Sequence, residues 1–295
     1  MKLSVVILPC ARWEEVRTNW TTADEWGLHA GYTYDHLSWR SFRDAAWFSM
    51  VPTLVAAATV TSSLRLGPLV TSANFRHPLV LAKDLIAIDD ISSGRLNVGI
   101  GAGGTGYDAA TLGHEPWSRG ERHARFVEFS RALERLLREP SSTLDGHYYP
   151  VVDSRQIPGP RQLPRPPIYL SALGLRSLAL TAEIADGWVS IGDPSGSADS
   201  STFDAVKTQV MALNVELEAR GREPSTLHRV LLNFEGDETP MSSYESFLDW
   251  AGRYYELGFD EVVVHWPVKA SPFDCDPSLF ERICREGGAL LPSWQ

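Results

Sequence analysis

The stretch from Arg65 to Gly104 constrains the fold more than any other part of this chain. Two runs with the composition of β-strands, LRLGPLV and RLNVGIGA, flank a segment in which apolar residues recur at three- and four-residue steps. That spacing predicts a helix with one buried face, with Pro78 in its first turn and Ser92-Ser93-Gly94 at its end. A strand, a helix and a strand of this length predict a parallel crossover unit, which places the chain in the α/β class.

The remainder of the chain repeats this alternation. We expect strands at 3–8, 29–35, 64–70, 95–102, 166–172, 187–191, 228–234 and 261–266, and helices at 14–26, 48–62, 78–91, 122–138, 175–185, 203–220, 244–257 and 277–286. Residues 105–120 are expected to form a loop over the strand ends, and 139–166 an irregular surface segment rich in Pro and Gly. Eight βα repeats predict a (β/α)8 TIM barrel that takes up residues 1–295 as one domain. An open doubly wound sheet is the alternative, because periodicity does not reveal strand order.

Charge and cysteine content narrow the class of partner. The formal net charge is −10 and there is no long basic run, which argues against nucleic acid and anionic membranes as partners. The three cysteines are too few and too scattered for a disulfide framework, so a reduced, cytoplasmic setting is expected. The apolar start LSVVIL is too short for a signal peptide or a membrane span. A small-molecule substrate is therefore expected.

A glycine-rich run follows the fourth expected strand. Its sequence, Gly99-Ile-Gly101-Ala-Gly103-Gly104, matches G-x-G-x-x-G. A dinucleotide-binding fingerprint should lie in the first βαβ unit and open a helix at once, and this run does neither. The run could be a simple turn. We favour the interpretation that its glycines, which have no side chains, leave room for a flat ring to lie across the barrel mouth.

A second candidate site lies at Ser171-Ala172-Leu173-Gly174, where small residues leave a strand and enter a helix. Backbone N–H groups and the helix dipole at such a point can hold an anion, and Arg176 could add a positive charge. An ordinary strand-to-helix turn would have the same sequence pattern.

One histidine lies on the face where barrel enzymes place their chemistry. His36 follows Asp35 at the carboxyl end of the second expected strand, although a purely structural histidine is the alternative. Trp39 and Trp117 lie in loops expected over the same face and are candidates for a substrate pocket. The histidines show no metal-ligand spacing such as H-E-x-x-H, so no metal ion is expected.

Four motifs together resemble the luciferase-like monooxygenase superfamily. They are YDHL (34–37), RLGPLVTSANFRHP (65–78), GRLNVGIGAGG (94–104) and PPIYLSALGLRSLALTAEIADGW (166–188). The similarity spans nearly the whole chain, with the motifs in the same order and spacing. This superfamily includes FMN-dependent monooxygenases and enzymes that use the deazaflavin coenzyme F-420. The resemblance implies a (β/α)8 barrel with an isoalloxazine-type ring across the strand ends.

The resemblance also assigns roles to individual residues. His36 corresponds to the active-site histidine of the deazaflavin branch, beside the reactive ring carbon. Leu69-Val70 falls where family members carry a non-prolyl cis peptide that backs the ring. Thr71 and Gly101 to Gly104 would line the edges of the ring, and Ser171 to Gly174 would take the cofactor phosphate. The full set of expected cofactor-binding residues is Asp35, His36, Leu69, Val70, Thr71, Gly101, Ala102, Gly103, Gly104, Ser171, Ala172, Leu173, Gly174 and Arg176.

One departure from the family pattern bears on the reaction. The deazaflavin-dependent glucose-6-phosphate dehydrogenases carry a catalytic glutamate where this chain has Gly104, and sugar oxidation needs such an acid or base. We therefore expect an F-420-dependent oxidoreductase, acting as a homodimer, that transfers hydride to or from a small organic substrate such as an imine or enone. An FMN-dependent monooxygenase supplied by a flavin reductase is the same-fold alternative. A flavin-binding protein without turnover and a metal-dependent barrel hydrolase are the alternatives of other classes.

Overall fold

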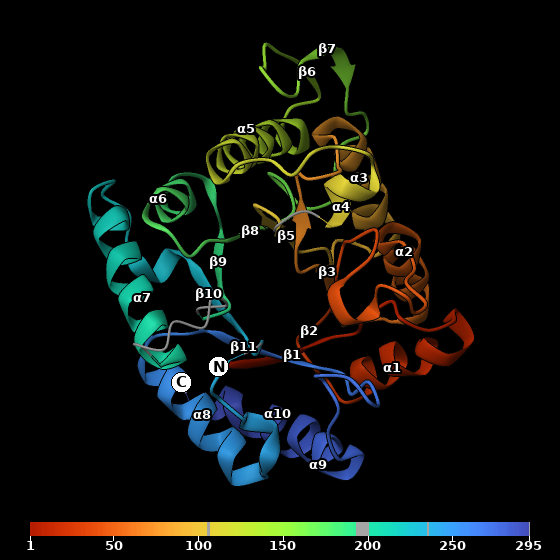
Figure 1. Ribbon diagram of the computed structural model, residues 1–295, viewed down its shortest axis with the longest axis vertical. Coiled ribbons are helices and arrows are strands. Elements are labelled where there is room, and N and C mark those ends of the chain that lie inside the picture. The colour runs from red at the N-terminus through yellow and green to blue at the C-terminus, as the bar shows by residue number, and fades with distance from the viewer. Residues whose placement is uncertain (105–106, 193–200, 235, 295) are drawn as a thin grey trace.

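The central feature of the fold is a closed barrel of parallel strands inside a ring of helices (Figure 1). The computed structural model describes residues 1–104, 107–192, 201–234 and 236–294. The strands follow one another in the order β3-β2-β1-β11-β10-β9-β8-β5-β4, and every neighbouring pair is parallel. Strands β3 and β4 are two pieces of one strand position, and Leu66 in β3 also bridges to Leu96 just before β5. The sheet therefore closes, which confirms the (β/α)8 barrel and excludes the open doubly wound sheet.

The elements lie close to their expected positions. The barrel strands are β1 (Lys2–Val6), β2 (Ala30–Thr33), β3 (Arg65–Pro68), β4 (Thr71–Ser72), β5 (Val98–Gly101), β8 (Ile168–Ser171), β9 (Gly187–Ser190), β10 (His228–Leu232) and β11 (Glu261–His265). The helices are α1 (Trp13–Glu25), α2 (Met50–Val60), α3 (Pro78–Ile91), α4 (Tyr107–Thr111), α5 (Arg119–Arg138), α6 (Leu175–Ile184), α7 (Thr202–Glu218), α8 (Tyr244–Glu256), α9 (Pro277–Arg282) and α10 (Gly288–Leu290). Residues 283–287, between α9 and α10, form a π-helical turn.

Two expected irregular segments contain regular structure. Residues 139–166 hold an antiparallel hairpin, β6 (Ser141–Leu144) and β7 (Val151–Arg155), which lies outside α5 in Figure 1. The expectation of an irregular segment was wrong there, because the strands are short and one of them is mostly exposed, which removes the alternating pattern. The expected loop at 105–120 contains α4 and the first two residues of α5, a helix that Ser118 caps by accepting a hydrogen bond from the backbone of Glu121.

Side-chain alternation along β11 divides the core into an inner and an outer part. Val263 packs inside the barrel, whereas Val262 and Val264 pack between the sheet and the surrounding helices. Because successive side chains of a strand point to opposite faces, Glu261 and His265 share the inward face of Val263. Both are almost completely buried, and they lie at opposite ends of the same strand. The barrel interior is thus apolar in the middle and carries ionisable groups at both ends.

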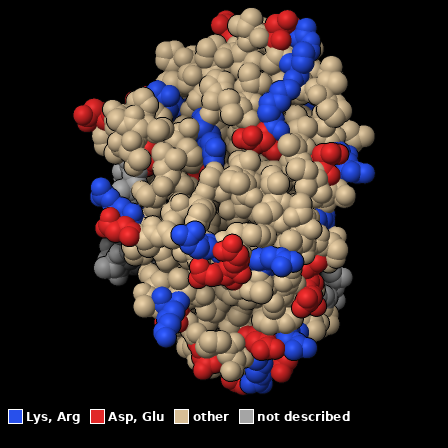
Figure 2. All heavy atoms as spheres, turned by 90° about the vertical axis from the view of Figure 1, so that its right-hand side faces the viewer, with Lys and Arg blue, Asp and Glu red and all other residues tan. Residues whose placement is uncertain are grey.

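The surface shows mixed charge. On the face seen in Figure 2, cationic and anionic side chains lie interspersed, and neither sign forms a continuous patch. No helix in the described ranges combines the length and the apolar character that crossing a membrane requires. The three cysteines are all free thiols.

Candidate active site

A cavity of about 420 Å³ opens at the carboxyl ends of the barrel strands. It is lined by eleven of the residues expected from the sequence: His36, Trp39, Leu69, Val70, Gly101, Ala102, Gly103, Gly104, Ser171, Leu173 and Gly174. A volume of this size falls in the range of small-molecule and cofactor sites, which is about 300–1,000 Å³. The fold therefore brings segments far apart in the sequence to one pocket on the face where barrel enzymes place their chemistry.

Five expected residues are absent from the lining of this cavity. Asp35, Thr71 and Ala172 are buried behind it, at 1%, 0% and 1% relative exposure. Arg176 is exposed in the first turn of α6. Trp117 lies over the guanidinium of Arg125, 3.9 Å from the ring centroid, rather than against the cavity.

His36 is paired with a carboxylate that the sequence did not single out. Its Nδ1 lies 2.8 Å from Oδ2 of Asp108 in α4, and Oδ1 of Asp108 accepts a hydrogen bond from the backbone N–H of Leu37 at 2.7 Å. Asp108 is 3% exposed, and Trp47 donates a hydrogen bond to the backbone oxygen of His36. A carboxylate on Nδ1 selects the tautomer with its proton on that nitrogen, which leaves Nε2 to exchange a proton with a group in the cavity.

A second buried carboxylate supports the wall of the cavity from behind. Asp35 accepts two hydrogen bonds from the guanidinium of Arg76, at 2.6 and 3.0 Å, and one from the hydroxyl of Thr71 at 2.7 Å. Burial lowers the pKa of Arg76, but the hydrogen bonds and charge of Asp35 outweigh this and raise it. Asp35 and Thr71 therefore act in this structure as supports rather than as wall residues.

Leu69 and Val70 form a wall of the cavity next to β5, and the peptide bond between them is cis, which confirms the expectation from the sequence. The glycine run packs tightly against this segment. A Cβ on Gly101 would lie 2.6 Å from Val70, and one on Gly103 would lie 1.9 Å from the Asn74 side chain. Gly103 also has φ +72°, a conformation that strongly favours glycine. Gly104 has neither constraint, since a Cβ there would meet no atom within 4 Å.

The segment from Ser171 to Gly174 leads into a helix that lacks a side-chain cap. Gly174 is the N-cap of α6, and no side chain accepts a hydrogen bond there, whereas α5, α7 and α8 each begin with a capping serine. Ser177, in the first turn, also lines the cavity and lies 3.3 Å from Nδ1 of His123. The first N–H groups of a helix need an acceptor from outside the helix, so this end is suited to an anion.

Sequence reasoning missed several lining residues. Tyr34, Asn74, Asp108, Ser177 and Phe234 all reach the cavity. The hydroxyl of Tyr34 lies 2.7 Å from Nε2 of His265, the inward-facing histidine at the end of β11. Burial lowers the pKa of His265 to about 3, so this ring is neutral near pH 7. A carboxylate or hydroxyl close to a strand end was an available signal for Tyr34, Asp108 and Ser177, whereas nothing local in the sequence marks Asn74 or Phe234.

Residues 1–234 match the family model described as luciferase-like monooxygenase. The chain belongs to this family. Membership confirms the resemblance drawn from the four motifs, and it agrees with the barrel and with the cavity at its strand ends.

Curated relatives of this luciferase-like protein use two kinds of cofactor, as their names state. An F-420-dependent glucose-6-phosphate dehydrogenase of Kineococcus radiotolerans is 29% identical over 78% of this chain and 66% of its own length. The oxygenase component of a flavin-dependent trigonelline monooxygenase of Acinetobacter baylyi is 30% identical over 51% of this chain and 40% of its own length. The matched stretch spans about half to two thirds of the first curated relatives.

Among solved structures, an F-420-dependent secondary alcohol dehydrogenase superposes with a TM-score of 0.80. The superposition covers 100% of this chain and 99% of the other, at 14% identity. At this level of identity the likeness bears on the fold, and it agrees with the closed barrel described above.

Proposed function

We propose that this protein is an F-420-dependent oxidoreductase that transfers hydride between the deazaflavin and a small organic substrate such as an imine or enone. The observation that carries the proposal is the His36–Asp108 pair in the wall of the cavity. The cavity wall at position 104 is a glycine, which offers no acid or base there. Relatives named as F-420-dependent dehydrogenases support the class of cofactor.

The residues present fit a flat ring with a phosphate-bearing chain. Leu69 and Val70 give one apolar wall, and Gly104 and Gly174 line open space, since a Cβ on either would meet no protein atom within 4 Å. The uncapped start of α6 offers N–H donors for a phosphate. We expect Leu69 and Val70 to contact the ring, Gly101 to Gly104 to follow its edge, and Ser171 to Gly174 to hold the phosphate.

When bound, the deazaflavin would supply the carbon that gives or accepts the hydride. The protein itself manages the proton. In a reduction, His36 gives a proton from Nε2 to the substrate atom that gains negative charge, and in an oxidation Nε2 takes it back. Asp108 holds Nδ1–H throughout and stabilises the charged imidazolium. A single imidazole with one carboxylate behind it is sufficient for substrates that need one proton.

The FMN-dependent monooxygenase supplied by a flavin reductase remains the second candidate. The relative named as a flavin-dependent monooxygenase supports it. The same cavity would take the FMN ring, because the apolar wall and the phosphate site do not distinguish FMN from a deazaflavin. The homodimer and the reductase partner expected from the sequence also stay predictions.

The deciding experiment is a pair of cofactor titrations followed by turnover. Purified protein is titrated anaerobically with F-420 and with FMN while fluorescence and absorbance are recorded. Reduced F-420 is then mixed with imines and enones, and the return of oxidised deazaflavin absorbance is followed. We expect micromolar or tighter binding of F-420 and turnover without oxygen. Much tighter binding of FMN, with turnover only in air, would replace this proposal with the monooxygenase, and binding without any turnover would favour a non-catalytic flavin-binding protein.

A further inference from the structure

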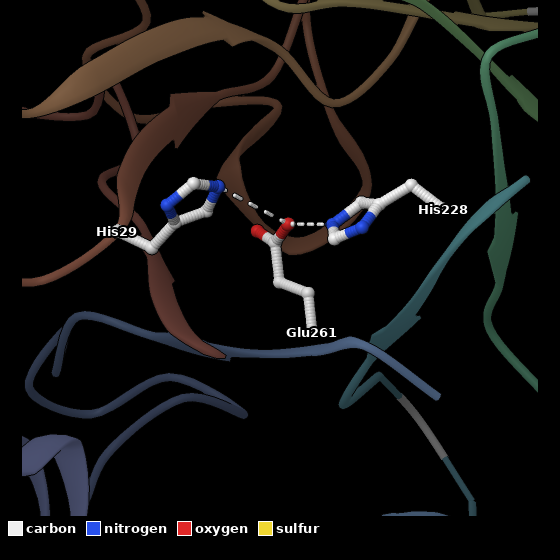
Figure 3. Close-up of side chains that lie close together, drawn as sticks. All are labelled: His29, His228 and Glu261. Carbon is white, nitrogen blue, oxygen red and sulfur yellow. Dashed lines mark hydrogen bonds and ion pairs between the residues drawn. The ribbon is translucent and has the colours of Figure 1, made fainter. Parts of the chain in front are cut away.

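Three ionisable side chains converge at the end of the barrel opposite the cavity. His29 directly precedes β2, His228 is the first residue of β10, and Glu261 is the first residue of β11. Figure 3 shows the two imidazole rings pointing at the Glu261 carboxylate from either side. In barrel proteins this amino-terminal face contributes to stability rather than to catalysis, so the cluster is separate from the proposed active site.

The ligand-type atoms of the cluster lie close enough to share one ion. The two ring nitrogens and the carboxylate oxygen all lie within 4.8 Å of one another. Oε2 of Glu261 is 2.8 Å from Nε2 of His228 and 3.8 Å from Nε2 of His29. Ligands in a tetrahedral Zn²⁺ site are about 3.3 Å apart, so these two distances bracket the required value.

Groups behind the cluster orient Glu261 and place a carboxylate near His228. Oε1 of Glu261 accepts a hydrogen bond from the hydroxyl of Tyr32, which in turn accepts one from the amide of Asn97. Nδ1 of His228 lies 3.7 Å from Oδ2 of Asp260. Carboxylates behind the free nitrogen of a coordinating histidine are typical of zinc sites, because they fix the tautomer that leaves Nε2 available.

Charge and exposure also suit a cation with nitrogen ligands. Glu261 is fully buried, whereas the side chains of His29 and His228 are 22% and 19% exposed, so an ion has a route from solvent. Lys2 and Arg65 place positive charge near this end, and Glu261 and Asp260 place negative charge there.

We propose that His29, His228 and Glu261 form a binding site for Zn²⁺, with water as the fourth ligand. Two imidazole nitrogens and one carboxylate oxygen are a typical zinc donor set, whereas Mg²⁺ prefers oxygen ligands throughout. Coordination through Nε2 requires the tautomer of His228 that carries its proton on Nδ1, the nitrogen that faces Asp260. The ion would link the starts of β2, β10 and β11, which lie on both sides of β1. It would therefore stabilise the barrel where its first strand, β1, pairs with its last strand, β11.

This proposal departs from the expectation of no metal ion drawn from the sequence. Its three ligands come from strands far apart in the chain, and no local spacing marks them. The proposal does not depend on the proposed function, because the cluster and the cavity lie at opposite ends of the barrel.

The test measures zinc binding to the untagged protein. After treatment with EDTA and its removal, the protein is dialysed against Zn²⁺ and its metal content is determined. We expect one zinc ion per chain, bound at micromolar or lower concentration, no displacement by millimolar Mg²⁺, and a rise in melting temperature of several degrees. Failure of the native protein to bind zinc, or equal binding of Mg²⁺, would overturn the proposal.

Matched variants locate the ion. His29 has a partly exposed side chain, so its replacement should disturb folding the least of the three. His29→Gln is expected to weaken zinc binding at least tenfold. Asp260→Asn is expected to weaken it about tenfold, because Asp260 acts on the metal through His228. His147→Gln, an exposed histidine of the β6–β7 hairpin loop, and His36→Ala in the cavity should bind zinc as the native protein does. Glu261→Gln should abolish binding where the variant folds. Unchanged zinc affinity in both His29→Gln and Asp260→Asn would place the ion elsewhere and refute the site.

Discussion

Oδ2 of Asp108 lies 2.8 Å from Nδ1 of His36, although the two residues are 72 positions apart in the chain. The first comes from the short helix α4 after β5, and the second follows β2. The contact gives the imidazole a fixed tautomer and orientation beside the cavity. Its chemical role can be tested by changing either partner.

Replacing His36 by Ala is expected to lower turnover by about 10²–10⁴-fold, because general acid or base assistance of this kind contributes that much. Cofactor affinity should change little. The measurement is single-turnover kinetics with reduced F-420 beside a fluorescence titration. Full activity in this variant would remove the catalytic role of His36 while leaving the cofactor assignment in place.

Asp108→Asn is expected to lower turnover by up to about 10⁴-fold without weakening cofactor binding, since an amide does not stabilise the imidazolium as the carboxylate does. Asp108 is a positioning residue, so its effect should depend on His36. The double variant should be no slower than His36→Ala alone, because two residues that act as a unit are not additive. Additive losses would show that Asp108 acts independently of the histidine.

Gly103 and Gly104 make a matched pair for the glycine run. Gly103→Ala should cost about 1–3 kcal/mol from its positive φ alone, and more from the overlap with Asn74. Gly104→Ala, with open space around the new methyl group, should change stability by less than about 0.5 kcal/mol. Urea unfolding of both variants measures the difference. Equal stabilities would contradict the described geometry of this run.

The start of α6 provides a test of the phosphate site. Gly174→Asp would place a carboxylate at the N-cap, where φ −100° and ψ 153° accept any residue and a Cβ has room. The free protein should be as stable as the native one or more so, by about 0.3–1 kcal/mol. Cofactor affinity should fall at least tenfold through repulsion of the phosphate, whereas the uncharged Gly174→Asn should bind nearly normally. Identical affinities in the two variants would place the phosphate elsewhere.

The buried pair of Asp35 and Arg76 should be more important for stability than an exposed ion pair. Arg76→Met leaves a carboxylate that is 1% exposed without its main partner and is expected to cost about 3–5 kcal/mol. Arg131→Met, which removes an exposed pair with Glu183, should cost about 0–1 kcal/mol. Chemical denaturation gives both values. A small loss in Arg76→Met would mean that Asp35 is satisfied by Thr71 alone.

His265 should make the protein sensitive to acid. Its pKa is about 3 in the folded protein because of burial, against 6.5 for an unperturbed histidine, so the unfolded chain binds the extra proton between these values. The contribution of His265 to the free energy of unfolding is therefore fully present above pH 6.5. It falls as the pH drops toward 3, by at most roughly 1.4 kcal/mol per pH unit. Unfolding of the native protein and of His265→Gln from pH 7 to pH 4 should give a flatter dependence in the variant. Parallel curves would refute the role of His265.

The sequence by itself determined the order of strands and helices and, with the family resemblance, much of the cavity wall, and the first of these has a local reason. Alternating strands and helices leave their periodicity in neighbouring residues, and tight turns such as Gly103 require particular residues, so both are visible without any long-range contact. The placement of His36 and of Ser171 to Gly174 follows from the same rule, because the carboxyl ends of parallel strands share one face.

Only the tertiary structure decided which side chains meet. Asp108 joins His36, and Glu261 joins His29 and His228, through the order and register of strands that lie far apart in the chain. The tertiary structure also places Asp35 behind the cavity wall, where it pairs with Arg76. Local periodicity fixes which face of an element is buried but carries no information about its neighbours, because those depend on how the sheet closes.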